Sequence, residues 1–121
     1  MKIRVKGNSI RVRLQQNELT ELISNHKLVE STIINTFEIF SCELISAESF
    51  SVEFIANILT IQIPSGTLES WASGDEVSLE ELWNNGTEKG LKILIEKDFA
   101  CLSNRPDEDD SDAFPNPNKS C

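Results

Sequence analysis

The sequence predicts an α+β fold in which eight mostly antiparallel strands form either a barrel or two packed sheets, together with two short helices. Two observations predict these elements: apolar and polar residues alternate in several short runs, and two other stretches have helical spacing. A third observation is that the chain aligns with itself at an offset of 49 residues. Together they favour a duplicated strand, strand, helix, strand, strand unit.

The first two strands are predicted from the opening segment. Apolar and basic residues alternate on both sides of the turn-forming residues Gly7 and Asn8. This alternation predicts an antiparallel hairpin with one apolar face and one cationic face. The apolar residues are Ile3, Val5, Ile10, Val12 and Leu14, and the basic residues are Lys2, Arg4, Lys6, Arg11 and Arg13.

A short helix and four strands are predicted next. Asn17 can cap a helix that extends to about Asn25. Leu19, Leu22 and Ile23 share one face of this helix. The four strands are predicted at residues 28–34, 36–45, 50–55 and 58–63.

The second helix and two further strands complete the predicted domain. Pro64 ends the preceding strand, and helical spacing follows over residues 66–73. Leu68 and Trp71 share one face of this helix, and Gly74 stops it. The last two strands are predicted at residues 76–82 and 91–99.

The self-alignment pairs the first predicted helix with the second, so that Leu19 matches Leu68 and Leu22 matches Trp71. Chance is the alternative explanation, because any two amphipathic hairpins look alike. The predicted pseudo-repeats are about residues 1–46 and 50–99, within a single domain of residues 1–103.

Residues 104–121 are predicted to form an acidic extended tail. This segment contains three of the four prolines, shows no periodicity, and carries five acidic residues between Asp107 and Asp112. An EF-hand calcium loop is excluded, because it would need glycine in place of Asp112 and glutamate in place of Asn118. Three interpretations stay open: a solvated tail, a strap over the cationic hairpin, or a partner-binding tail.

The composition indicates a small cytoplasmic globular protein, with 39% hydrophobic and 26% charged residues and no apolar run long enough to span a bilayer. The opening residues lack the apolar core of a secretory signal. Three cysteines are too few for a disulfide framework. The net charge of −9 argues against nucleic acid as a partner, and no membrane partner is expected.

The cationic face of the hairpin is the candidate binding site. The first thirteen residues carry five of the eleven basic residues and no acidic one, whereas the rest of the chain carries all twenty acidic residues. Two interpretations stay open: a solvated face with weak ion pairs, or a pocket for an anion such as phosphate. The candidate anion-binding residues are Arg4, Lys6, Arg11 and Arg13, and the candidate acidic partners are Glu53, Glu96 and Asp98.

No catalytic residue, metal or cofactor is predicted. A duplicated small barrel with a charged interior is similar in outline to the triphosphate tunnel enzymes, but residues 2–6 read KIRVK where those enzymes open with Glu-x-Glu-x-Lys. His26 follows the first helix, with no nucleophile or acid evident beside it. Cys101 and Cys121 lack the usual spacing of zinc ligands.

Motifs at the two ends of the chain resemble one family. Residues 2–11 read KIRVKGNSIR, and the other end reads EKDF at residues 96–99, then Cys101 and Leu102, then FPNP at residues 114–117. In combination these motifs resemble a family of short uncharacterised bacterial proteins defined only as a domain of unknown function. The resemblance implies a small cytoplasmic bacterial protein and carries over no activity, cofactor or catalytic residue.

The sequence therefore favours a non-enzymatic binding or interaction module that uses the cationic hairpin, with a protein or a small anion as its partner. The alternative is an anion-binding barrel or a metal-assisted phosphohydrolase that uses the charged sheet face. The two differ in where the basic side chains point: toward open solvent, or into a concave site that contains acidic residues.

Overall fold

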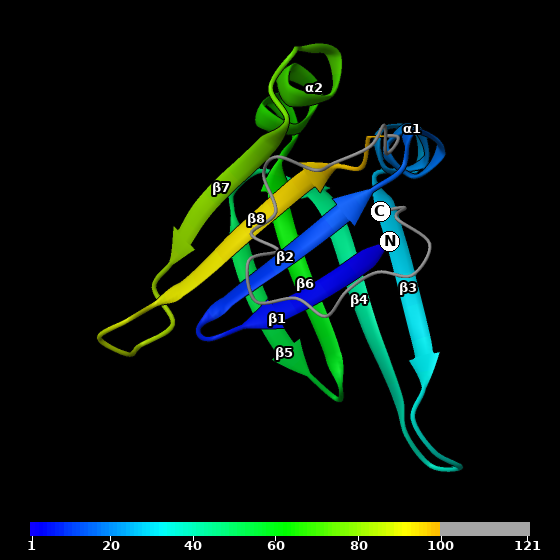
Figure 1. The fold of residues 1–121 in the computed structure, drawn as a ribbon, viewed down its shortest axis with the longest axis vertical. Coiled ribbons are helices and arrows are strands. Elements are labelled where there is room, and N and C mark those ends of the chain that lie inside the picture. The colour runs from blue at the N-terminus through cyan, green and yellow to red at the C-terminus, as the bar shows by residue number, and fades with distance from the viewer. Residues whose placement is uncertain (100–121) are drawn as a thin grey trace, which may run out of the picture.

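The computed structural model describes residues 1–99 and contains two four-stranded sheets and two helices (Figure 1). The α+β prediction is confirmed, and the arrangement is two sheets, with no closed barrel within residues 1–99. The strands are β1 (Lys2–Lys6), β2 (Ser9–Leu14), β3 (Lys27–Ile33), β4 (Ile39–Ala47), β5 (Ser51–Ile55), β6 (Ile58–Pro64), β7 (Ser78–Trp83) and β8 (Leu91–Lys97), and the helices are α1 (Gln16–Asn25) and α2 (Ser65–Ser73).

Each sheet combines strands from both halves of the sequence. The first sheet has the order β1-β2-β8-β7 and the second has the order β3-β4-β6-β5. The two central strands of each sheet are parallel, and both outer pairs are antiparallel. Because β2 pairs with β8, the opening hairpin lies beside the last described strand rather than beside β3.

The two halves of the chain pair their strands in corresponding registers. Lys2 lies opposite Arg13 in the first hairpin, and Ser51 lies opposite Gln62, each 49 residues further on. The pairing of β7 with β8 repeats that of β3 with β4 at an offset of 51 residues. A duplication in which the halves exchange hairpins would produce this correspondence, and the duplication itself stays a prediction.

The core lies between the two sheets and beneath the helices. In Figure 1 one sheet lies over the other, and both helices cover the same end of them. Cys42 and Trp71 are both buried. The buried core residues are Val12, Leu14, Leu22, Leu28, Cys42, Leu44, Leu59, Ile61, Ile63, Leu68, Trp71, Ile93 and Ile95.

The predicted cap of the first helix is wrong by two residues. Helix α1 begins at Gln16 and its N-cap is Gln15, whose backbone N–H donates to Glu18 Oε1 at 2.9 Å. This capping box places Asn17 inside the first turn. At the other end, His26 has a φ of 62° and forms the left-handed C-cap, consistent with its predicted place after the helix.

The strand predicted at residues 36–45 begins later, at Ile39. The side chain of Asn35 closes a turn instead, since its Oδ1 accepts hydrogen bonds from the backbone N–H groups of Phe37 and Glu38 at 2.9 and 3.0 Å.

Neither helix within residues 1–99 has the length and hydropathy that a membrane-spanning helix requires.

The amino group of Met1 joins the opening segment to α1 and β3. It forms ion pairs with Glu18 and with Glu30, the latter at 2.9 Å from Oε1. Partial burial acts to lower the pKa of this amino group, but the hydrogen bonds to Glu18 and Glu30 outweigh it and raise the pKa above 8.0. The stability that these ion pairs provide is therefore complete below pH 8 and lost at higher pH.

Replacing Cys42 is expected to flatten the pH dependence of stability in alkaline solution. Burial of Cys42 raises the pKa of its thiol from 9.0 to about 11, so its stabilising contribution is complete below pH 9 and is lost toward pH 11. The loss from this group is at most about 1.4 kcal/mol per pH unit. Urea unfolding at a series of pH values should show that the free energy of unfolding declines less steeply with pH for Cys42→Ala than for the parent. Both proteins carry the Met1 amino group, so its contribution cancels in this comparison. Equal declines would contradict the assignment of the pH dependence to Cys42.

Candidate functional site

The basic residues of the opening hairpin share the outer face of the first sheet. Their neighbours in sequence, such as Val12, face the core, and Arg4 lies directly opposite Arg11. Strand β8 adds Lys92, which flanks the buried Ile93 and pairs with Ser9 of β2. The cationic face thus consists of Lys2, Arg4, Lys6, Arg11, Arg13 and Lys92.

One carboxylate lies between two arginines of this face. Arg11 Nε is 2.9 Å from Glu96 Oε1, and Arg13 Nε is 3.1 Å from Glu96 Oε2. The side chains of Arg13 and Glu96 are each 13% exposed, and that of Arg11 is 37% exposed. The parallel pairing of β2 with β8 creates this cluster, because it places Arg13 beside Glu96. A single negative charge therefore offsets part of two positive charges.

A second carboxylate lies where β2 ends. Asp98 Oδ2 is 3.3 Å from Lys2 Nζ, and the backbone N–H of Asp98 donates to the carbonyl of Leu14 at 2.8 Å. Only 8% of the Asp98 side chain is exposed, compared with 67% for Lys2. The structure therefore brings two of the three candidate acidic partners, Glu96 and Asp98, to the cationic face.

The third candidate acidic partner lies elsewhere. Glu53 is on β5, opposite Thr60, in the second sheet. The alternation of a strand predicts which face a side chain occupies, but it does not predict which sheet the strand joins. A different acidic residue, Glu80, lies at the edge of the cationic face, where its Oε1 is 3.0 Å from Lys92 Nζ.

Four of the six basic residues of the cationic face are exposed. Lys2, Lys6 and Arg4 are exposed along β1, and Lys92 is 49% exposed on β8. Neither of the two pockets described below, both within residues 1–99, is lined by Arg4, Lys6 or Arg11. The arrangement is thus suited to binding an extended anionic surface rather than to enclosing a small anion.

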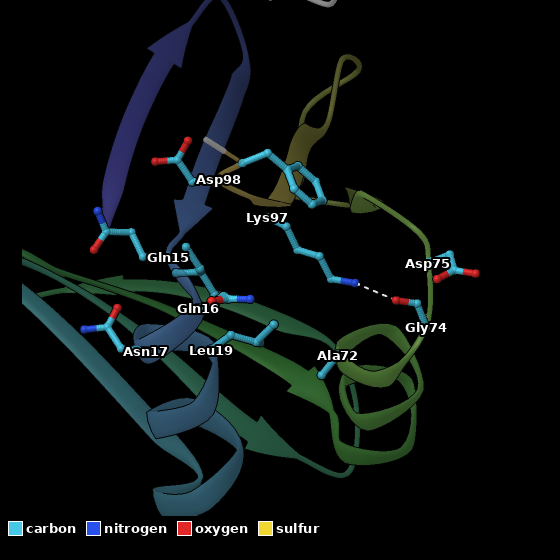
Figure 2. Close-up of a pocket in the computed structure, with 11 residues that line it drawn as sticks. Gln15, Gln16, Asn17, Leu19, Ala72, Gly74, Asp75, Lys97 and Asp98 are labelled. Atoms are coloured by element: carbon cyan, nitrogen blue, oxygen red, sulfur yellow. Dashed lines mark hydrogen bonds between the residues drawn. The ribbon is translucent and has the colours of Figure 1, made fainter. Parts of the chain in front are cut away.

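A separate pocket of about 980 Å³, lined by both polar and apolar residues, lies at the helix-covered end (Figure 2). Its wall includes the start of α1, the end of α2 and the residues that follow β8. Lys97 Nζ donates to the carbonyl of Gly74 at 2.9 Å and lies 5.2 Å from the ring centroid of Trp71. Figure 2 shows Lys97 extending toward Gly74 and away from Asp98. The ammonium group of Lys97 therefore joins β8 to the end of α2.

An apolar cleft of about 470 Å³ opens between the sheets at the opposite end. Its lining residues lie near the hairpin turns, and two of them, Val5 and Phe54, are 70% and 62% exposed. Alternation predicts both residues on the inner faces, which is where they lie. Their exposure could not be predicted, because the helices cover only the other end of the two sheets.

The other candidate residues within residues 1–99 form no recognisable site. Within residues 1–99 no group of three or more histidine, cysteine, aspartate or glutamate side chains is placed to hold a metal ion. His26 caps α1, and its backbone carbonyl accepts a hydrogen bond from Ser46 at 2.9 Å. Cys101, Cys121 and the predicted acidic tail lie outside the described residues.

Comparison with known proteins gives a family without a known activity. A family model described as "Family of unknown function" matches residues 1–118. The match spans both terminal motifs through residue 117, so the predicted resemblance to a domain of unknown function is confirmed. No match was found among the curated proteins or among the solved structures.

Proposed function

Because this chain belongs to the family of unknown function DUF7009, we infer its role from its geometry and propose that it is a non-enzymatic binding module whose cationic face binds acidic segments of a protein partner. One observation carries the proposal: six basic residues lie on one sheet face, and within residues 1–99 their acidic neighbours are Glu80, Glu96 and Asp98. A chain with a net charge of −9 has concentrated its positive charge on one surface.

The spacing of the cationic face favours an extended acidic peptide. Outward-facing residues recur at every second position of a strand, which is about 6.6 Å apart. Alternate side chains of an extended peptide have the same repeat, so successive carboxylates can meet Lys2, Arg4 and Lys6 in order. A compact anion could contact only one or two of these groups at once.

The alternative anion-binding barrel or phosphohydrolase is less well supported by this arrangement. Such a site needs convergent acidic groups that could hold a metal beside the basic ones. Glu53 lies in the other sheet, and Glu96 and Asp98 are engaged with Arg11, Arg13 and Lys2. The geometry therefore favours binding over catalysis.

Removing two charges from the cationic face is expected to weaken acidic-peptide binding about tenfold. Lys6→Gln/Lys92→Gln removes two exposed contacts, each contributing roughly 0.2 to 1 kcal/mol, and salt should weaken the parent complex more than the variant complex. Fluorescence anisotropy with a labelled poly-glutamate peptide measures both effects.

The matched control is Lys27→Gln/Lys89→Gln, which makes the same change in net charge at residues outside the cationic face. Lys27 pairs with Glu43 on the second sheet, with Lys27 Nζ 3.3 Å from Glu43 Oε2. This control should bind the peptide almost as tightly as the parent. Equal weakening by the two double variants would mean that net charge, and not the cationic face, governs binding.

A further inference from the structure

We propose that the chain's own acidic segment, residues 107–112, occupies the cationic face and competes with an external acidic partner for it; this inference rests on the proposed function. Charge complementarity is the first support. Five of the six residues in this segment are acidic, and the cationic face carries an excess of basic residues. Nowhere else in the chain do five acidic residues fall within six consecutive positions.

The position where the described chain ends is the second support. Phe99 is the second residue after β8, and β8 is the neighbour of β2 within the cationic face. Asp98 is already held there by Lys2 Nζ at 3.3 Å and by the carbonyl of Leu14 at 2.8 Å. The connection to the acidic segment therefore starts at the edge of the cationic face.

The length of the connection is the third support. Seven residues separate Phe99 from Asp107 in the sequence, so the eight steps from one Cα atom to the next span up to about 26 Å when extended. Strand β2 has six residues and is therefore about 20 Å long. The acidic segment can reach every basic residue of the cationic face without strain.

The spacing of the acidic residues matches that of the basic ones. In an extended conformation Glu108, Asp110 and Asp112 share one side of the segment. Lys2, Arg4 and Lys6 share the outer side of β1 at the same interval. Because the segment is tethered, its effective concentration is in the millimolar range, so weak contacts suffice to compete with a free peptide.

Neutralising the acidic segment in the full chain tests the competition. The variant Asp107→Asn/Glu108→Gln/Asp109→Asn/Asp110→Asn/Asp112→Asn is expected to bind the poly-glutamate peptide about tenfold more tightly than the parent. Lys6→Gln/Lys92→Gln should reverse that gain. Equal affinities for the parent and the neutralised variant would overturn the competition and leave the proposed function standing.

Zero-length cross-linking of amines to carboxylates tests the docking directly. Peptide mapping of the cross-linked monomer is expected to join Lys6 or Lys92 to residues 107–112. The contacts of Lys2 with Asp98 and of Lys27 with Glu43, each at 3.3 Å, are internal positive controls. If the two control cross-links are detected and no cross-link to residues 107–112 is found, the inference is overturned. A cross-link to residues 107–112, together with no binding of the poly-glutamate peptide by the parent or by the neutralised variant, would overturn the proposed function alone.

Discussion

Trp71→Ala is expected to lower the free energy of unfolding by about 3 to 5 kcal/mol. The Trp71 side chain is 2% exposed and packs from α2 into the core cluster. Its ring also lies 5.2 Å from Lys97 Nζ, which in turn donates to the carbonyl of Gly74. Alanine would leave a large cavity and would loosen α2 from β8 at the same time.

Trp71→Phe separates the packing of this residue from its polarity. The indole Nε1 is buried and finds no hydrogen-bond partner in the described part of the chain. Phenylalanine removes this unsatisfied donor while keeping an aromatic ring, so we expect a loss of only about 1 kcal/mol.

Trp83→Ala is the matched control for Trp71→Ala. Trp83 is half-buried and contacts Phe50 edge-on, with ring centroids 6.0 Å apart, so its removal is expected to cost about 1 to 2 kcal/mol. Urea unfolding followed by circular dichroism gives all three values. If Trp71→Ala costs no more than Trp83→Ala, α2 is not anchored through Trp71.

The sequence predicted the elements of the fold better than their connections. Alternation located the eight strands, and helical spacing located both helices. The parallel pairs could not be predicted, because β2 joins β8 through contacts such as that of Ser9 with Lys92, far apart in the chain. Local patterns specify the face of a strand, and burial against distant partners specifies its neighbours.

The same distinction explains the candidate site. Five members of the cationic face belong to one hairpin, so alternation alone placed them together. Lys92 was missed, although it has the same alternation phase as Glu96 on β8, because its membership depends on the parallel pair. The place of Glu53 outside this face could not be predicted for the same reason, since β5 joins the second sheet. The helix cap at Gln15 was missed because asparagine is the commoner cap and Asn17 lies two residues away.

Glu96→Gln is expected to lower the free energy of unfolding by about 2 to 3 kcal/mol. Glutamine keeps the size of the side chain but removes the negative charge between Arg11 and Arg13, whose Nε atoms lie 2.9 and 3.1 Å from the carboxylate oxygens. Because Glu96 and Arg13 are only 13% exposed, water can replace little of the lost attraction. Arg11 and Arg13, which are successive outward-facing residues of β2, would then repel each other.

Glu80→Gln is the control, since Glu80 also lies on the outer face of the first sheet and also pairs with a basic residue. Its side chain is 57% exposed and that of Lys92 is 49% exposed, so we expect a change of less than about 0.5 kcal/mol. Urea unfolding at low salt compares the two variants. Similar losses would show that burial does not strengthen the Glu96 cluster.

The effect of Glu96→Gln on binding is expected to be opposite in sign to its effect on stability. Without the carboxylate, less of the positive charge of Arg11 and Arg13 is neutralised, so the poly-glutamate peptide should bind more tightly than it binds the parent. Glu96 would thus hold the cationic face together at the expense of affinity. A variant that is less stable and also binds more weakly would mean that Glu96 orders the arginines for binding, rather than neutralising them.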